Sequence, residues 1–192
     1  MSLFDCKAYG SVFGYLLEKP TSIMPLDQGM QYNEIKNELE VLDLEQAFAP
    51  CPIVDEMMAE GCKSGLWLYN NFLDESHTLS QRIGTPTGSY WHAIMHRREP
   101  DYPNGRYWFD RVGDHDIYPI LKREAKKFAL AVKELPNEAS YLVSQLVWDP
   151  FAFVDLCESS NLGRVPAGDL CRRIQQREWE LLFDYCYQKA IG

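Results

Sequence analysis

The sequence has no run in which apolar and polar residues alternate over the length of a strand. Such alternation marks a half-buried β-strand, so its absence argues against a predominantly β fold. Internal repeats, low-complexity segments and a linker long enough to separate two domains are also missing. The 192 residues are enough for about one domain, and 46% of them are hydrophobic. This composition excludes a disordered or fibrous chain.

Long hydrophobic stretches and paired cysteines are lacking as well. No apolar run approaches the roughly 20 residues that a membrane-spanning helix needs. Asp5, Lys7 and Glu18 interrupt the first apolar residues, so we expect no signal-peptide core. The six cysteines show neither a Cys-x-x-Cys pair nor a zinc-knuckle spacing. We therefore expect reduced, mostly buried thiols in a cytoplasmic protein.

The chain has little positive charge, with a formal net charge of −9. This balance argues against non-specific binding to nucleic acid or to an anionic membrane surface. Residues 1–60 hold eleven acidic residues against three lysines, a net charge of −8. We interpret the acidic segment 34–60 as a solvated helix face, and an acidic docking surface for a basic partner is the alternative.

Apolar residues at helical spacing are abundant after residue 32. Residues 1–32 contain several glycines and prolines, which predict an irregular N-terminal arm. Residues 33–192 are expected to form a single all-α domain of about seven helices. The first predicted helical segment begins at Asn33. The second runs from 54 to 81, with a bend near Gly61 and Gly65. The others cover 87–99, 101–113, 116–135, a stretch after Asn137, 151–158 and 166–189.

All four histidines lie between residues 77 and 115, with three of the five tryptophans in or beside that block. Polar and aromatic side chains interleaved in this way are common where a pocket holds a polar ligand against apolar walls. His92, His96 and Glu99 fall at i, i+4 and i+7, so they share one face of a predicted helix. The same spacing relates three residues of the preceding segment, Asn70, Asp74 and His77.

Antiparallel packing across the short turn at 82–88 would bring these two stripes together. His77, His92 and His96 could then bind zinc or another divalent ion. The same histidines, with Asp74 or Glu99 to orient an imidazole or activate water, could instead act as metal-free acid–base groups. A third interpretation, a buried structural network of satisfied histidines, is equally compatible with the spacing.

Candidate ligand-binding residues in this block are Trp91, Arg97, Asn104, Trp108 and Arg111. The arginines could hold a carboxylate or phosphate by paired hydrogen bonds. Ion pairing with nearby acidic residues is the alternative for each arginine, and a place in the core is the alternative for Trp91.

The segment from Tyr90 to Glu99, Tyr-Trp-His-Ala-Ile-Met-His-Arg-Arg-Glu, resembles a motif of an uncharacterised family of microbial proteins. Members show a similar Asp-Glu-Ser-His segment before it, here residues 74–77, and later segments like residues 104–109 and 112–115. The similarity spans about a quarter of the chain. It implies where the site lies but supplies no reaction, because this family has no established activity.

The order of His77, His92 and His96 is also similar to that in the metal-binding four-helix bundles of the DinB type. In those proteins, however, the His-x-x-x-His pair lies near the end of the chain and the intervening connection is longer.

These observations predict a small-molecule enzyme or sensor whose polar pocket, built by residues 70–115, binds a small polar or anionic ligand, with dependence on a divalent metal such as zinc as one of the open alternatives. The alternative is an interaction protein with an acidic docking face at 34–60 and a purely structural histidine network.

Overall fold

The computed structural model describes residues 4–19 and 22–192. In this part of the chain all regular structure is helical, which confirms the all-α class. The prediction of about seven helices is too low, because several predicted segments are broken into shorter ones. The eleven α-helices are α1 (Gly10–Glu18), α2 (Lys36–Glu40), α3 (Leu44–Phe48), α4 (Glu56–Tyr69), α5 (Leu73–Ser80), α6 (Pro86–Arg98), α7 (Tyr102–Val112), α8 (Tyr118–Leu130), α9 (Tyr141–Ser144), α10 (Pro150–Asn161) and α11 (Gly168–Ile191), with short 3-10 turns η1 (Cys6–Tyr9), η2 (Asn33–Ile35) and η3 (Asn137–Ala139).

The N-terminal arm predicted to be irregular contains a helix. Helix α1 buries Phe13 and Leu16 in the core. Gly14 lies inside this helix, where a Cβ atom would come within 3.3 Å of the backbone oxygen of Cys6. This glycine therefore permits close packing between η1 and α1 and does not interrupt the helix.

Residues 54–81 form two helices whose break differs from the predicted one. Gly61 and Gly65 lie within α4, and the ring of Trp91 packs directly on them. A Cβ atom at Gly65 would lie 2.9 Å from that ring. The chain breaks instead between α4 and α5, where Asn71 adopts a positive φ of 65°. The two glycines are thus packing positions for Trp91.

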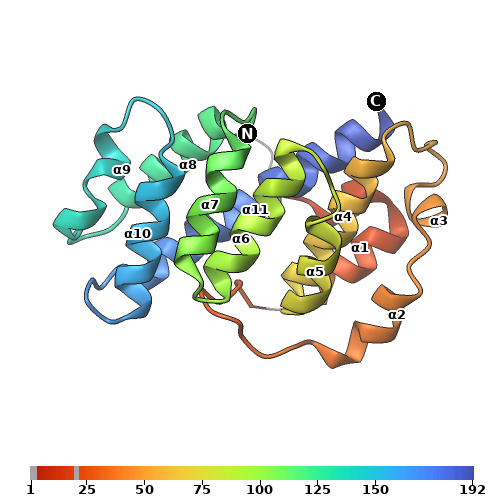
Figure 1. Cartoon of the computed structure of the whole chain (residues 1–192), viewed down its shortest axis with the longest axis horizontal. Helices are drawn as coiled ribbons and strands as arrows, with labels where there is room; N and C mark the ends of the chain where they lie inside the picture. Colours follow the sequence, from red (N-terminus) through yellow and green to blue (C-terminus); the bar gives the residue numbers. More distant parts are fainter. Residues whose placement is uncertain (1–3, 20–21) are drawn as a thin grey trace.

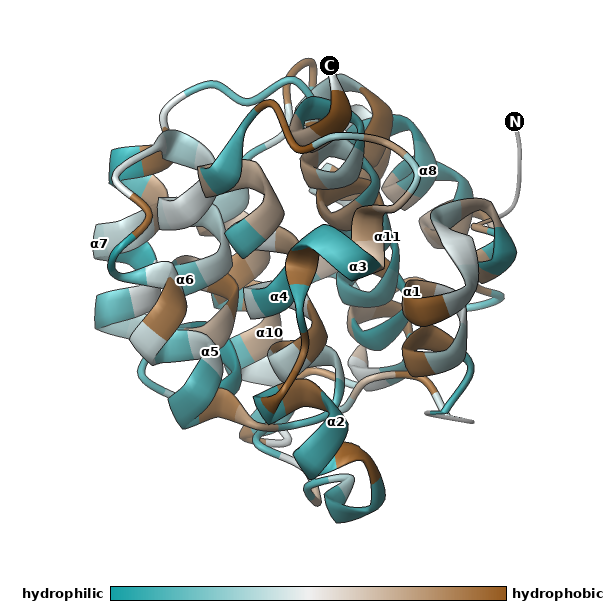
Figure 2. Ribbon diagram, turned by 90° about the vertical axis from the view of Figure 1, so that its right-hand side faces the viewer, coloured by the Kyte–Doolittle hydropathy of each residue, from teal (hydrophilic) through white to brown (hydrophobic). Residues whose placement is uncertain are grey.

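The acidic segment 34–60 does not form one continuous helix face. It is divided among η2, α2, α3 and the first turn of α4, and Asp43 caps α3 by accepting a hydrogen bond from the backbone N–H of Glu45 at 3.0 Å. Figure 2 shows mostly hydrophilic residues on α2, whereas α3 carries both hydrophilic and hydrophobic ones. The docking of a basic partner on this segment stays a prediction.

Helix α6 lies in the middle of the molecule, between α4 and α5 on one side and α7 on the other, with α11 behind it (Figure 1). Twelve of its thirteen residues are buried. A helix enclosed in this way must find partners for its polar side chains, because an unpaired buried polar group is costly.

Arg97 of α6 finds its partner on α11. Its guanidinium donates to the carboxylate of Glu178 and to Oε1 of Gln175, the latter at 3.3 Å. Tyr90 donates to the other carboxylate oxygen of Glu178 at 2.9 Å. Burial alone would lower the pKa of Arg97, but the Glu178 carboxylate outweighs it and the pKa is raised. The guanidinium is therefore held as a charged partner of Glu178.

The neighbouring Arg98 holds the segment before η2 against the end of α4. Its guanidinium donates to the backbone oxygens of Asp27, Gln28 and Leu68, at 3.2, 3.2 and 2.6 Å. It also donates to the side-chain oxygen of Asn71, whose amide group donates to the Met30 backbone oxygen at 2.7 Å. These bonds explain how residues without regular structure are fixed to the core.

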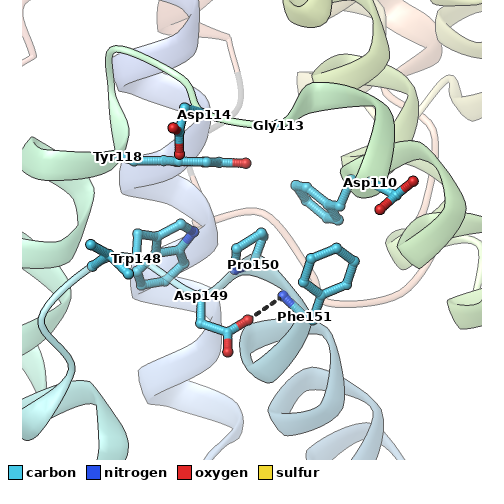
Figure 3. Close-up of a pocket in the computed structure, with 10 residues that line it drawn as sticks. Asp110, Gly113, Asp114, Tyr118, Trp148, Asp149, Pro150 and Phe151 are labelled. Carbon is cyan, nitrogen blue, oxygen red and sulfur yellow. Dashed lines mark hydrogen bonds between the residues drawn. The ribbon is translucent and has the colours of Figure 1, made fainter.

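The remaining features follow from the same helical packing. All six cysteines are free, as expected, and Cys62, Cys157, Cys171 and Cys186 are buried. No helix in the described ranges is both long and apolar enough to cross a membrane. The loop after α7 faces the segment before α10 across a pocket (Figure 3).

The buried ion pair makes a prediction about stability. Glu178→Gln leaves the Arg97 charge without its counter-ion in the core, which should lower the free energy of unfolding by about 3 kcal/mol. Glu180, on the same helix, forms a partly exposed pair with Arg177 at 3.0 Å. The control Glu180→Gln should cost less than about 1 kcal/mol. Urea unfolding measures both, and equal costs would contradict the role given to Glu178.

Candidate functional site

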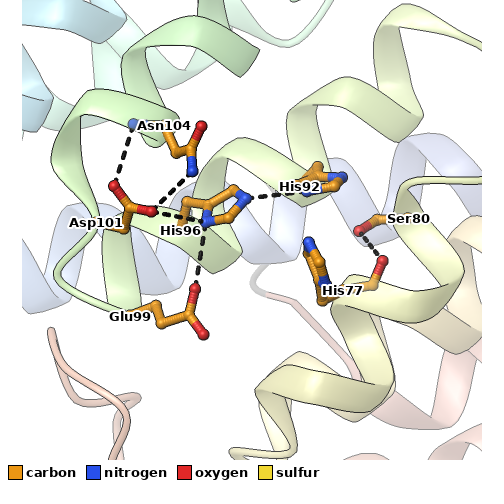
Figure 4. Close-up of polar contacts among 7 residues, drawn as sticks. All are labelled: His77, Ser80, His92, His96, Glu99, Asp101 and Asn104. Carbon is orange, nitrogen blue, oxygen red and sulfur yellow. Dashed lines mark hydrogen bonds and ion pairs between the residues drawn. The ribbon is translucent and has the colours of Figure 1, made fainter.

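The packing of α5 against α6 brings three of the four histidines together (Figure 4). The ring of His77 lies 4.6 Å from that of His92 and 5.3 Å from that of His96. Thr85 fixes the start of α6, because its hydroxyl accepts a hydrogen bond from the Gly88 N–H at 3.1 Å and Pro86 begins the first turn. The predicted meeting of the two histidine-bearing segments is confirmed.

His92 and His96 face each other through their Nε2 atoms, which lie 3.0 Å apart. Burial, together with smaller effects of the nearby His96 and His77 rings, lowers the pKa of His92 to about 3. Burial also lowers the pKa of His96, against the opposing effect of Glu99. Both rings are therefore uncharged at neutral pH, which is the form of histidine that binds metal ions.

Two carboxylates lie on the far side of the His96 ring. Its Nδ1 atom is 3.2 Å from Oε2 of Glu99 and 3.8 Å from Oδ2 of Asp101. A carboxylate accepts hydrogen bonds and donates none, so the proton of the neutral ring is assigned to Nδ1. The lone pair of His96 then lies on Nε2, toward His92 and His77. The shared helix face predicted for Glu99 and His96 thus places a Glu99 carboxylate oxygen beside the His96 ring, and a catalytic role of Glu99 stays a prediction.

Asn104 supports this arrangement indirectly. Its side-chain amide donates to Oδ2 of Asp101 at 2.8 Å, and its backbone N–H lies 3.3 Å from Oδ1. Asp101 thereby caps α7 while its carboxylate stays beside His96. Asn104 holds Asp101 in place, and the ligand contact expected of Asn104 stays a prediction. Asp101 itself was not among the predicted site residues. Its position just after Pro100 is a helix-start signal, and this start lies close in sequence to the last turn of α6.

Two sets of residues place metal-ligating atoms within 4.8 Å of one another. The first is His77, His92 and His96, and the second is His96, Glu99 and Asp101. A separation of 3.0 Å between the Nε2 atoms of His92 and His96 is close to that of two adjacent ligands bound at about 2.0–2.1 Å to one ion. A carboxylate on the other nitrogen of a ligating histidine is the usual outer partner in such sites. The first set therefore fits a metal ion best.

Trp108 and Arg111 of α7 border the histidines. The Trp108 ring stacks on the His92 ring at 3.9 Å with an interplanar angle of 15°. The guanidinium of the exposed Arg111 lies 5.5 Å from the Trp108 ring and hydrogen-bonds the Tyr107 hydroxyl. Trp108 therefore borders the histidines directly and Arg111 lies beside Trp108, while the ligand contacts of both residues stay a prediction.

Three other candidates lie elsewhere. Asp74 is exposed, and its backbone oxygen accepts a hydrogen bond from the Thr78 hydroxyl. Asn70 ends α4, so the break before α5 removes it from the stripe predicted to include His77. Trp91 is a core residue whose Nε1–H contacts the sulfur of Cys186.

Arg97 points to Glu178 on α11, so the ion-pairing alternative fits its position. Arg106 likewise forms an ion pair with Asp155.

His115 shows what a satisfied structural histidine looks like in this protein. Its Nδ1 accepts a hydrogen bond from the Ile117 backbone N–H at 3.4 Å, and its Nε2 lies 3.2 Å from the Thr87 hydroxyl. By contrast, Nδ1 of His92 is buried and has no hydrogen-bond partner in the described part of the chain. The His115 ring, bonded at both nitrogens, thus differs from the His92 ring of the cluster, whose Nδ1 is unpaired within the described residues.

Comparison of the chain with family models, curated proteins and solved structures gave no significant match. The resemblance of residues 90–99 to an uncharacterised microbial family stays a prediction. The chemistry of the site must therefore be argued from its geometry.

The environment of His115 predicts a pH dependence of stability. Burial lowers its pKa from 6.5 to about 4, against a smaller opposing effect of Asp116. Between these values the unfolded chain binds a proton at this ring and the folded protein does not, so stability falls as the pH drops. From pH 7 to pH 5 this histidine should account for a loss of about 2 kcal/mol.

The variant His115→Asn keeps an acceptor for the Ile117 N–H but does not titrate. Its unfolding free energy, measured in urea at both pH values, should fall by about 2 kcal/mol less than that of the unchanged protein. The same decrease in both proteins would show that His115 does not stay neutral on folding.

Proposed function

We propose that His77, His92 and His96 bind one divalent metal ion, such as zinc, and that this ion is the reactive centre of an enzyme acting on a small polar or anionic molecule. The observation that carries the proposal is the pair of buried, uncharged imidazoles whose Nε2 atoms face each other at 3.0 Å beside a third histidine. Without an ion, only one of the two nitrogens can donate a proton to the other, and Nδ1 of His92 stays without a partner among residues 4–19 and 22–192.

The surroundings support the same proposal. Glu99 and Asp101 hold the His96 ring through Nδ1 and make its Nε2 the more basic. Three protein ligands would leave a fourth position for water or substrate, which is the arrangement of catalytic rather than structural zinc sites. Such an ion would polarise a substrate oxygen or lower the pKa of bound water.

Arg111 and Trp108 give the substrate preference. Arg111 supplies an exposed positive charge on the same side as the Trp108 ring, which itself covers His92. A planar guanidinium binds carboxylates and phosphates well, and the indole ring offers an apolar wall. An anionic small molecule fits this combination.

The first test is metal stoichiometry. Protein purified without an affinity tag is incubated with zinc, dialysed and analysed by elemental mass spectrometry. We expect about one equivalent in the unchanged protein and a large loss in His92→Ala, because the loss of one of three ligands removes much of the binding free energy. His115→Asn, at the histidine whose ring nitrogens are already bonded, is the matched control and should keep the ion. Circular dichroism checks that all three proteins keep their helical content.

Two further variants separate the alternative ligand sets. His77→Ala should abolish binding if the three histidines hold the ion, and should leave binding intact if the ion lies between His96, Glu99 and Asp101. Glu99→Gln should weaken zinc affinity by about 10- to 100-fold without changing the stoichiometry, because it orients a ligand. The proposal is lost if the unchanged protein takes up no stoichiometric divalent ion.

A further inference from the structure

Two adjoining pockets lie away from the histidine cluster, between the end of α7, the loop that follows it and the segment before α10 (Figure 3). Their volumes are about 380 and 430 Å³. They share four lining residues, Asp114, Tyr118, Val147 and Trp148. Pockets of about 300–1,000 Å³ are typical of small-molecule sites.

The walls of the first pocket are mainly aromatic. The rings of Phe109, Tyr118, Trp148 and Phe151 surround it, and Pro150 forms part of the floor in Figure 3. These residues come from α7, α8, the 146–149 segment and α10, so the chain assembles the rings from four separate elements. Several aromatic faces around one space attract a cation through their negative π surfaces.

Two polar atoms in these walls have no partner. The Tyr118 hydroxyl and the Trp148 Nε1–H are both buried without a hydrogen bond in the described part of the chain. The two residues are 7% and 4% exposed. Figure 3 shows both atoms directed into the space between the rings. An unpaired buried donor is costly, so both atoms favour a ligand that carries an oxygen acceptor.

The charge of the lining is negative. Four aspartates and Lys122 line the two pockets, giving a formal charge of −3 with His115 neutral. The Lys122 ammonium already donates to the Leu146 backbone oxygen at 2.7 Å, and the Asp149 carboxylate caps α10. Asp114 forms no ion pair within the described residues, and its carboxylate is directed toward the Tyr118 ring in Figure 3.

We propose that this pocket binds a small organic ammonium ion that also carries one oxygen acceptor. The aromatic rings surround the ammonium group, Asp114 balances its charge, and Trp148 or Tyr118 donates a hydrogen bond to the oxygen. This site is independent of the proposed metal centre, since none of the three clustered histidines lines it.

Three probes separate the parts of this proposal in titration calorimetry. Choline carries both the charge and the oxygen, tetramethylammonium carries only the charge, and 3,3-dimethylbutan-1-ol is the uncharged carbon analogue of choline. We expect choline to bind most tightly, and the neutral alcohol to bind on the order of tenfold more weakly or worse. Equal binding of choline and the alcohol, or no binding of choline at millimolar concentrations, would overturn the proposal.

Two variants assign the contacts. Asp114→Asn is on an exposed residue and should weaken both cations by about two- to fivefold. Glu134→Gln removes one negative charge from another exposed position and should leave binding unchanged. Trp148→Phe keeps an aromatic ring but removes the N–H donor, so choline should lose its advantage over tetramethylammonium. If Trp148→Phe does not fold, Asp114→Asn still decides, because equal binding in Asp114→Asn and Glu134→Gln would contradict a site at this pocket.

Discussion

Helix α6 runs through the centre of the molecule with twelve of its thirteen residues buried, although it carries two histidines, two arginines and a tyrosine. Each of these side chains must be satisfied without water, and the surrounding helices are arranged accordingly. Arg97 and Tyr90 share Glu178 of α11, and Arg98 is surrounded by backbone oxygens. The position of α11, the end of α4 and the segment before η2 all depend on these bonds.

In the pair formed by His92 and His96 of α6, the described residues do not supply a hydrogen-bond partner for every ring nitrogen. Arg98 on the same helix donates to the Leu68 backbone oxygen and two others, and His115, in the loop after α7, is bonded through both ring nitrogens. At the histidine pair, Nδ1 of His92 is buried with no partner within the described residues, Nδ1 of His96 has only the nearby carboxylates of Glu99 and Asp101, and the two Nε2 atoms face each other. Nε and Nη1 of Arg97 are also unpaired within the described residues, so the feature particular to the histidine pair is its two facing Nε2 atoms, on which the proposed metal site rests.

Helix α7 connects the two proposed sites. Trp108 stacks on His92, while the next residue, Phe109, lines the aromatic pocket. Gly105 allows α7 to lie close to α6, since a Cβ atom there would meet the Arg97 backbone at 3.4 Å. A single helix thus presents one side chain to a site that favours an anion and the adjacent one to a site that favours a cation.

The all-α class and the meeting of His77 with His92 and His96 could be predicted from sequence, because both depend on local spacing and a short turn. The breaks at Asn71 and between α2 and α3 could not, since they depend on tertiary contacts such as the bonds of Arg98 and Asn71. The bend predicted at Gly61 and Gly65 is wrong for the same reason, because their packing partner Trp91 is distant in sequence. The ion pair of Arg97 could not be predicted either, because its partner Glu178 lies 81 residues away in the sequence.

X-ray absorption at the zinc edge tests the central claim most directly, because it identifies the atoms bound to the ion in the zinc-loaded protein. The geometry of His77, His92 and His96 predicts a first shell containing three imidazole nitrogens at about 2.0 Å with one further light atom. A shell dominated by carboxylate oxygens with a single imidazole would place the ion beside Glu99 and Asp101. That result would contradict a metal centre built on the three histidines.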